Sequence, residues 1–293
     1  MLSILIPTYN YDVTNLVSQL YNQCIEVPNL SFEIIVYEDG STNTDIIQLN
    51  KKIANIRYLY NEDNIGRTAA RNFLAKSALF DTLLFLDADT LPKKSNFIDK
   101  YLTTFAKVKV PTAIFGGYYY QTTSYKVENS LRYYYGKIRE ESSAENRNKN
   151  AYAYVFSGNF MINKNDFLSL NIPSTNIYGM DNYISYLLKK NKIDVYHIEN
   201  EIIHLGLEKN IDFYNKSITS IKFRKENMLD CHEIISSNAL LKTYRKLNFF
   251  PINLILKINY SIFGNTLKKM FFKPKPNLKA FDIYRLLYLF NLK

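Results

Sequence analysis

The sequence contains no tryptophan and only two cysteines, Cys24 and Cys231. Two cysteines without metal-type spacing exclude a disulfide framework and a cysteine-based zinc domain. This usage is typical of a protein that is kept reduced in the cytoplasm. The sequence also has no internal repeat, which excludes a solenoid.

Long apolar runs are missing as well. Residues 248–263 are interrupted by Pro251 and Lys257, well short of the roughly 18 apolar residues that a membrane-spanning helix needs. Met1–Ile6 is too short for the apolar core of a signal peptide, has no basic start and ends at Pro7, so we expect it to be the first strand. With 47% hydrophobic and 22% charged residues, the 293-residue chain has a globular composition.

Charge is unevenly distributed along the chain. Counting Lys and Arg against Asp and Glu, residues 1–208 carry 21 positive and 22 negative side chains. Residues 209–293 carry 16 positive and 5 negative side chains, a net charge of +11. A neutral body followed by a basic region predicts two domains, 1–208 and 209–293, with separate roles.

Apolar strands and amphipathic helices alternate through the first 90 residues. The helices are predicted at 14–25, with Thr14 as the cap, at 45–53 and at 67–78, and the strands at Ser3–Ile6, Phe32–Tyr37, Ile56–Tyr60 and Thr82–Leu86. This rhythm predicts a mostly parallel, right-handed α/β sheet. Loops after successive strands meet at one edge of such a sheet, so we expect a common cleft lined by Pro7–Asn10, Glu38–Ser41, Asn64–Arg71 and Asp87–Asp89.

The pattern changes after Asp89. Residues 118–150 are predicted to be helical, with a mobile loop at 142–150. Tyr154–Ile162 is predicted as a strand interrupted by Gly158, where a ligand can approach the backbone. Further strands are predicted at Thr112–Gly117, Ile193–Ile198 and Ile202–Leu205.

Two acids follow the strand Thr82–Leu86. On an extended backbone Asp87 and Asp89 point to the same side, at the strand end where ligands bind in open α/β sheets. Adjacent carboxylates repel unless a cation lies between them, and a Mg²⁺-type ion that holds a diphosphate meets that need. The alternative for so short a pattern is a pair of solvated acids in a turn.

Other polar side chains occupy the neighbouring loops. Asp39, at the end of the second strand, can accept from the imide of uracil or from ribose hydroxyls, or it can cap the next helix. Arg67 and Arg71 share a helix face and can pair with phosphates or form a solvated basic surface. Gly66 permits close backbone approach.

Asp181 and His204 are the remaining candidates. Asp181 starts an apolar helix and can be a general base or only a helix cap. His204 can join Asp89 in an oxygen–nitrogen set suited to Mn²⁺ or Mg²⁺, or it can be a satisfied core histidine or a surface histidine. His197 and His232 have no comparable context.

Taken in order, these motifs resemble the family 2 glycosyltransferases with the GT-A fold. The resemblance covers about residues 1–210 and rests on Ile4-Leu-Ile-Pro-Thr-Tyr-Asn10, Glu38-Asp-Gly-Ser41, Asn64-x-Gly-x-x-x-Ala-Arg-Asn72, Asp87-Ala-Asp89, Gly158 with its neighbours, Asp181 and His204-Leu-Gly206. It implies a Rossmann-like, mostly parallel central sheet flanked by helices. Residues 1–208 would be the catalytic domain, with 1–110 as the nucleotide-binding half and 111–208 as the acceptor half, followed by a helical, basic C-terminal extension.

The same resemblance implies an inverting, non-processive transfer of a sugar from a nucleotide-diphosphate donor, with a UDP-sugar favoured, to a hydroxyl of a glycan or lipid-linked acceptor. Asp181 would be the general base, and Asp87, Asp89 and His204 would hold Mn²⁺ or Mg²⁺. Acceptor contacts would come from Ser157, Gly158 and Asn159. Donor contacts would come from Pro7, Thr8, Tyr9, Asn10, Glu38, Asp39, Gly66, Arg67, Arg71, Asp87, Ala88 and Asp89.

The sequence departs from the family pattern in two places. Many members have Asp where this chain has Glu38, and many have Glu where Met180 precedes Asp181, which leaves one carboxylate for the base. The Gln-x-x-Arg-Trp signature of processive members needs a tryptophan, so its absence favours single addition.

Two other functions are weighed against the transferase. A pyrophosphorylase-like nucleotidyltransferase should carry a Gly-rich loop with Arg and Lys after the first strand, and Pro7–Asn10 has none. A non-catalytic, membrane-associated sugar-binding protein would not need Asp87, Asp89, Asp181 and His204 together.

The basic C-terminal region is predicted to be helical. Lysines mixed with Phe271 and Phe272 follow an apolar face marked by Ile252, Ile255, Ile258 and Ile262. This combination predicts attachment of residues 239–293 to an anionic membrane surface, on the inner face of the cell membrane. The alternative is a helical subdomain that packs on the catalytic domain with a solvated basic face. Nucleic acid is not an expected partner, because no recognition module is present.

Overall fold

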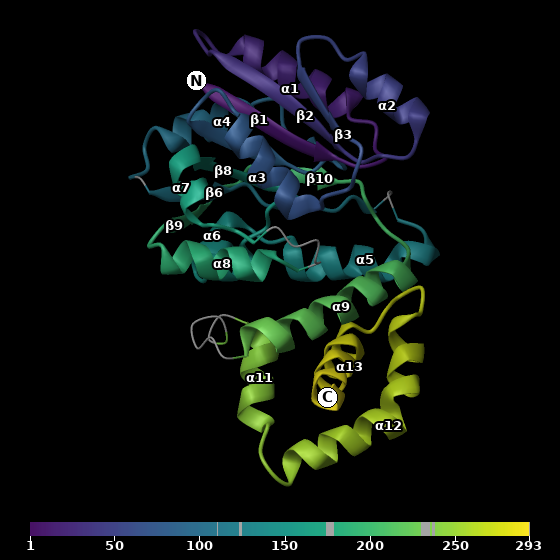
Figure 1. Ribbon diagram of the computed structural model, residues 1–293. Coiled ribbons are helices and arrows are strands. Elements are labelled where there is room, and N and C mark those ends of the chain that lie inside the picture. The colour runs from purple at the N-terminus through teal and green to yellow at the C-terminus, as the bar shows by residue number, and fades with distance from the viewer. Residues whose placement is uncertain (110, 123–124, 174–178, 230–234, 236–237, 293) are drawn as a thin grey trace. The chain divides into compact units, whose positions relative to one another are not determined.

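The computed structural model describes residues 1–109, 111–122, 125–173, 179–229, 235 and 238–292 (Figure 1). Tyr178, Cys231 and His232 lie outside these residues. The chain divides into two compact units. The first comprises Met1–Tyr119, Glu141–Asn176 and Ile184–Gly206, and the second comprises Tyr120–Glu140, Ile177–Tyr183 and Leu207–Lys293. The division predicted between residues 208 and 209 stays a prediction.

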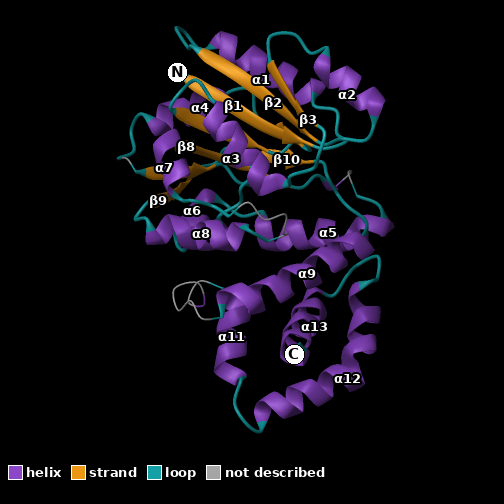
Figure 2. Cartoon of the chain, in the orientation of Figure 1, coloured by secondary structure: helices purple, strands orange, loops and turns teal. Residues whose placement is uncertain are grey.

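The first unit is built on a seven-stranded sheet with the order β3-β2-β1-β4-β8-β6-β9. β8 runs antiparallel to β4 and β6, and the other neighbours in the sheet are parallel (Figure 2). This confirms the predicted mostly parallel α/β fold. The bounds are β1 Leu2–Thr8, β2 Phe32–Asp39, β3 Arg57–Asn61, β4 Thr82–Leu86, β6 Thr112–Phe115, β8 Asn159–Asn163 and β9 Asp194–His197.

The order of the strands reverses between β1 and β4. The chain moves outward from β1 to β2 and β3, and then returns through α3 to place β4 beside β1. Right-handed crossovers therefore put α1 and α3 on opposite faces of the sheet, where α1 packs with α4 and α3 with α7. The carboxyl ends of β1 and β4 flank this switch point, which is where open α/β sheets bind ligands. The helices are α1 Thr14–Glu26, α2 Thr44–Lys51, α3 Arg67–Ser77, α4 Phe97–Phe105, α6 Ala144–Asn148, α7 Lys164–Ser169 and α8 Asp181–Lys190.

A second, three-stranded sheet in the same unit has the order β5-β10-β7. It consists of β5 Thr90–Pro92, β10 Ile202–His204 and β7 Tyr118–Tyr119. In the antiparallel pairing of β10 with β5, His204 lies opposite Thr90. This register brings His204 to the turn that contains Asp87 and Asp89.

Three local predictions are wrong. Thr14 is inside α1 instead of capping it, and its N–H is accepted by Asp12 Oδ1 at 2.8 Å. Tyr154–Ile162 is not one strand, because a 3₁₀ helix, Ala151–Tyr154, precedes β8. The loop predicted at 142–150 contains α6, which is fixed because the fully buried Arg147 donates to the carbonyls of Gly116 and Ile198 at 3.2 and 2.7 Å.

The second unit is helical. Its core contains buried side chains from four helices, which are Leu131, Phe213, Phe271, Leu278, Phe281 and Tyr284. Within the unit, α13 contacts α9, α11 and α12 (Figure 1). The bounds are α5 Ser130–Tyr135, continued by a π-helix at Gly136–Glu140, α9 Asn210–Met228, α11 Ala239–Leu247, α12 Ile252–Phe271 and α13 Leu278–Asn291. A short 3₁₀ helix, Val127–Asn129, precedes α5. Over the part of the chain that the structure describes, no helix has the length and apolarity to span a membrane.

Candidate functional site

Asp87, Ala88 and Asp89 form a turn at the end of β4 instead of continuing the strand. The Thr90 hydroxyl donates to the Asp87 carbonyl at 2.7 Å, which closes the turn. The alternation of side chains along an extended strand therefore does not apply, and each carboxylate has its own partner. The turn still lies at the switch-point edge, where the sequence predicted it.

Asp87 is paired with Arg71 of α3. The Arg71 Nη2 atom donates to Asp87 Oδ1, and the two side chains are 4% and 13% exposed. Burial acts to raise the pKa of Asp87, but the charges of Arg71, Arg67 and His204 outweigh it and hold this pKa below its ordinary value. Both arginines of the predicted donor site therefore lie near Asp87, which stays ionised.

Asp89 faces His204. Asp89 Oδ2 and His204 Nε2 are 4.0 Å apart, and the Asp89 side chain is 30% exposed, more than twice the exposure of Asp87. The Leu205 N–H also donates to the Asp89 carbonyl at 2.8 Å, which fixes the turn against the end of β10. Asp89 is thus the more accessible carboxylate of the pair, with an imidazole beside it.

Two glycines make this packing possible. A Cβ atom on Gly206 would collide with the Asp89 carboxylate, and one on Gly158 would collide with the Asp87 carboxylate and the Tyr118 hydroxyl. The Asp87 N–H also donates to the Gly158 carbonyl at 3.1 Å. The predicted close approach at Gly158 is therefore made by Asp87 and Tyr118 of the chain itself.

Asp39 organises the loop that leads into α3. Its two carboxylate oxygens accept from the N–H groups of Ile65 and Gly66 at 2.9 and 3.0 Å. Burial raises the pKa of Asp39, and these two hydrogen bonds oppose that rise. Gly40 has a φ of +70°, and a Cβ there would collide with the backbone of Asn64, so the close contact of the two loops requires glycine. Contact of Asp39 with a nucleotide stays a prediction.

Glu38 holds the loop after β1. Fully buried, it accepts from Ser41 and, at 3.1 Å, from Asn50, while the Ser41 hydroxyl accepts from the Asn10 N–H at 2.6 Å. Asn50 also donates to the Tyr11 carbonyl at 2.9 Å. Pro7, Thr8, Tyr9 and Asn10 are therefore held at the β1 end, and Tyr9 is half exposed.

The predicted acceptor residues Ser157, Gly158 and Asn159 are buried. The Asn159 amide donates to the carbonyls of Gly117 and Asn200 at 2.8 and 3.0 Å, and its oxygen accepts from the Tyr101 hydroxyl at 2.7 Å. These bonds engage the side chain within the fold, so acceptor contact by Asn159 stays a prediction.

Asp181 begins α8, and it belongs to the second unit together with Met180. The preceding Gly179 has a φ of +95°, and a Cβ there would collide with the Ser220 hydroxyl of α9. On the other side of Asp181, Asn182 accepts from Asn238 at 3.0 Å. The start of α8 is thus fixed within the second unit, and the placement of Asp181 against Asp89 stays a prediction.

Sequence reasoning missed three residues of the candidate site. Tyr11 lies close enough to Asp89 for that charge, after burial, to raise the pKa of its hydroxyl. The Tyr118 ring meets the His204 ring edge to face at 5.5 Å. Asn50 links the loops described above. Only the position of Tyr11, directly after the first loop motif, offered a signal.

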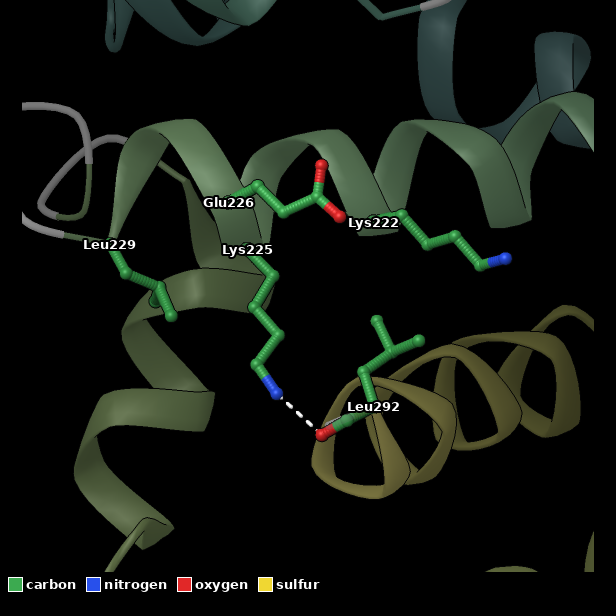
Figure 3. Close-up of a pocket in the computed structure, with 5 residues that line it drawn as sticks. All are labelled: Lys222, Lys225, Glu226, Leu229 and Leu292. Atoms are coloured by element: carbon green, nitrogen blue, oxygen red, sulfur yellow. Dashed lines mark hydrogen bonds between the residues drawn. The ribbon is translucent and has the colours of Figure 1, made fainter.

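The second unit contains a cavity of about 420 Å³ at the end of α9 (Figure 3). Lys225 donates to the Leu292 carbonyl at 2.5 Å across it. It contains none of the predicted site residues, and its lining is Lys222, Lys225, Glu226, Leu229 and Leu292.

A comparison with models of protein families shows which family the chain belongs to. Residues 3–169 match the model of Glycosyl transferase family 2. The chain belongs to this family. The match covers β1 to α7 and so includes Asp39, Arg71, Asp87 and Asp89 but not Asp181 or His204.

Curated relatives match shorter stretches. An uncharacterized glycosyltransferase of Rickettsia felis is 34% identical over 91 residues, which are 30% of this chain and 15% of that protein. Validoxylamine A glucosyltransferase of Streptomyces hygroscopicus subsp. limoneus is 36% identical over 96 residues, 31% of this chain and 21% of that protein. The chain thus matches about a fifth or less of the length of these relatives.

Solved structures share the fold over nearly the whole chain. The mannosyltransferase PcManGT from Pyrobaculum calidifontis, in complex with GDP-Man and Mn²⁺, has a TM-score of 0.59 at 12% identity, covering 98% of this chain and 85% of that one. S. aureus TarS 1-349 in complex with UDP-GlcNAc has a TM-score of 0.53 at 15% identity, covering 98% and 90%. At these identities the likeness shows the fold.

Proposed function

We propose that this chain transfers a sugar from a nucleotide-diphosphate donor, with a UDP-sugar favoured, to a hydroxyl of a glycan or lipid-linked acceptor. The transfer inverts the anomeric carbon, adds one sugar at a time and requires a divalent cation. The proposal rests on one observation above the others. Asp89, which lies within the residues that match the family 2 model, meets His204 beside the Arg71–Asp87 pair at the switch point of the sheet.

The donor set suits a hard divalent cation that is shared with a diphosphate. Within the described ranges no three His, Cys, Asp or Glu side chains form a metal-binding group, so these residues supply fewer ligands than a closed metal site needs. Mg²⁺-type ions take one or two carboxylates and complete their shell with phosphate oxygens and water. Asp89 and His204 would hold Mn²⁺ or Mg²⁺ in this way, with Asp87 supporting the site through its pairing with Arg71. The bound cation would stabilise the charge of the departing diphosphate.

The remaining residues would bind and orient the substrates. The loop after β1 and Asp39 would hold the base and ribose, since Glu38, Ser41 and Asn50 fix that loop before any donor arrives. Asp181 would take the proton of the acceptor hydroxyl while the acceptor oxygen attacks the anomeric carbon. The bond from that carbon to the diphosphate oxygen breaks, and the nucleoside diphosphate leaves with the electron pair. A single displacement of this kind inverts the anomeric configuration.

Donor binding and turnover test the proposal. The chain is screened by thermal shift against a panel of nucleotide sugars with Mn²⁺, and the stabilising donor is assayed for release of nucleoside diphosphate. Release that depends on the cation supports the transferase, whereas release of pyrophosphate supports a nucleotidyltransferase. The absence of donor binding across the panel refutes the proposal.

Two substitutions separate the proposed roles. Asp89→Asn should abolish cation-dependent donor binding, and Asp181→Asn should retain it while lowering transfer by roughly 10²–10⁴-fold. Asp99→Asn, on the exposed surface of α4, is the matched control and should change neither. If Asp89→Asn binds donor and cation as the unchanged chain does, Asp89 is not the ligand.

A further inference from the structure

The helix α12 has two faces with different environments. Tyr260, Gly264 and Leu267 lie on one face and pack toward α13, with the Tyr260 and Tyr284 hydroxyls 3.2 Å apart. The opposite face carries large aliphatic side chains at spacings of three and four residues, which places them along one stripe of a helix. These are Leu254, Ile255, Ile258 and Ile262, each at least half exposed.

The stripe continues into the turn before the helix. Phe249 and Phe250 precede Pro251 at the start of α12, and Phe250 is 79% exposed. We define the outer face of α12 as Phe249, Phe250, Leu254, Ile255, Ile258 and Ile262. A run of exposed apolar side chains of this kind along one helix face marks an interaction site.

The positive charge around the outer face of α12 favours an anionic partner. Residues 239–293 contain eleven Lys or Arg and one acid, Asp282, a net charge of +10 that equals the net charge of the whole chain. Asp282 is itself paired with Arg139 at 2.6 Å. Lysines and arginines lie on both sides of the outer face in sequence, at Arg245 and Lys246, at Lys257, and at Lys268, Lys269, Lys273 and Lys275.

We propose that the outer face of α12 inserts into the surface of an anionic lipid membrane, with the flanking basic residues on the headgroups. An amphipathic helix with lysines beside an apolar face lies in the membrane interface without crossing it. This fits the lack of a spanning helix among the described residues. A second copy of this chain is a poorer partner, because two segments of charge +10 repel each other. Nucleic acid offers negative charge to the basic residues, but it provides no apolar environment for the aliphatic side chains of the outer face.

Vesicle binding tests the proposal with a matched pair of variants. Ile262 and Ile25 are 61% and 60% exposed on helices of different units, so Ile262→Glu and Ile25→Glu change the same kind of surface residue. The full chain is sedimented with phosphatidylcholine vesicles, with and without phosphatidylglycerol. We expect binding to the anionic vesicles that falls with salt, is weakened by about tenfold or more in Ile262→Glu and is unchanged in Ile25→Glu.

The absence of tryptophan supplies a second readout. Phe250→Trp creates a single-tryptophan chain, and its emission should shift to shorter wavelength when anionic vesicles are added. Tyr60 is a half-exposed residue of β3 in the first unit, so Tyr60→Trp is the control and should show no shift. Equal vesicle binding by the Ile262→Glu and unchanged chains, or no shift for Phe250→Trp, overturns the proposal.

Two further measurements test self-association and donor binding. Light scattering that shows an oligomer dissociated by Ile262→Glu, with no vesicle binding by the unchanged chain, assigns the face to self-association and overturns the lipid proposal. Donor binding by Ile262→Glu, followed by thermal shift, should match that of the unchanged chain. Failure of the membrane inference therefore leaves the proposed transferase activity intact, and failure of donor binding leaves the vesicle result intact.

Discussion

The guanidinium of Arg71 is paired with the carboxylate of Asp87, and the two side chains are 4% and 13% exposed. The pair joins α3 to the turn after β4, so it fixes the position of the turn that carries Asp89. Arg71 Nε has no hydrogen-bond partner among the residues that the structure describes. The positive charge of the Arg71 guanidinium therefore depends on the Asp87 carboxylate for its counter-charge.

Removing either partner should destabilise the fold. Asp87→Asn and Arg71→Met each leave one buried group without its counter-charge, and we expect each to cost on the order of 3–5 kcal/mol in urea unfolding. The double variant should cost less than the sum of the two, by about 1–3 kcal/mol. Lys149→Met breaks an exposed pair with Glu145 and should cost less than about 1 kcal/mol. Strictly additive losses would show that the pair is not coupled.

Gly206 should be essential for the proposed metal site and less so for stability. A Cβ at this position would collide with the Asp89 carboxylate, so Gly206→Ala must displace Asp89 or the end of β10. Such overpacking costs about 1–3 kcal/mol in unfolding, and cation-dependent donor binding should be lost at the same time.

A second glycine controls for the substitution itself. Gly264 lies in α12 with no atom closer than 3.8 Å to its added Cβ, so Gly264→Ala should stabilise the chain by about 0.5–1 kcal/mol. Full cation-dependent donor binding by Gly206→Ala would argue against a role for Asp89 as ligand.

The sheet and the edge where the site lies could be predicted because their signals are local. Leu83–Leu86 is a continuous apolar run, and a strand covered on both faces needs such a run. Asp39 is the last residue of β2 and Asp89 lies in the turn after β4, so their places at the edge depend only on the order of strands and helices.

The rest depends on contacts between residues far apart in the sequence. β5 and β10 are three residues each, and the pairing of Thr90 with His204 leaves no periodic pattern to detect. Arg147 lies in a polar stretch typical of loops, yet its guanidinium is buried against two backbone carbonyls. The turn at Asp87 was predicted as extended because its closure by Thr90 is a side-chain effect.

Gly179 should affect transfer through the start of α8. With a φ of +95° and Ser220 against it, Gly179→Ala is both strained and crowded, and we expect a loss of at least about 1 kcal/mol in unfolding. Because Asp181 lies two residues on, the rate of transfer should fall while donor affinity is retained. Steady-state rates and donor thermal shifts of the same variant measure both effects. A parallel fall in donor affinity would place this segment in donor binding instead.

His197 should make the chain less stable in mild acid. Its side chain is buried and its ring Nε2 contacts the Ala151 carbonyl at 2.9 Å, and burial lowers its pKa from 6.5 to about 4. Between these two values the unfolded chain binds a proton that the folded chain does not, so the free energy of unfolding decreases as the pH falls through this range. The full effect is about 3 kcal/mol, and it is absent above pH of about 6.5.

His197→Gln removes the titration and can keep a donor to the Ala151 carbonyl. Its unfolding free energy, measured by urea titration at several pH values, should therefore depend less on pH between about 6.5 and 4 than that of the unchanged chain. Acids such as Asp87, whose lowered pKa affects stability only at still lower pH, are common to both chains and cancel in the difference. Parallel pH profiles for the two chains would mean that His197 is protonated in the folded state as readily as in the unfolded one.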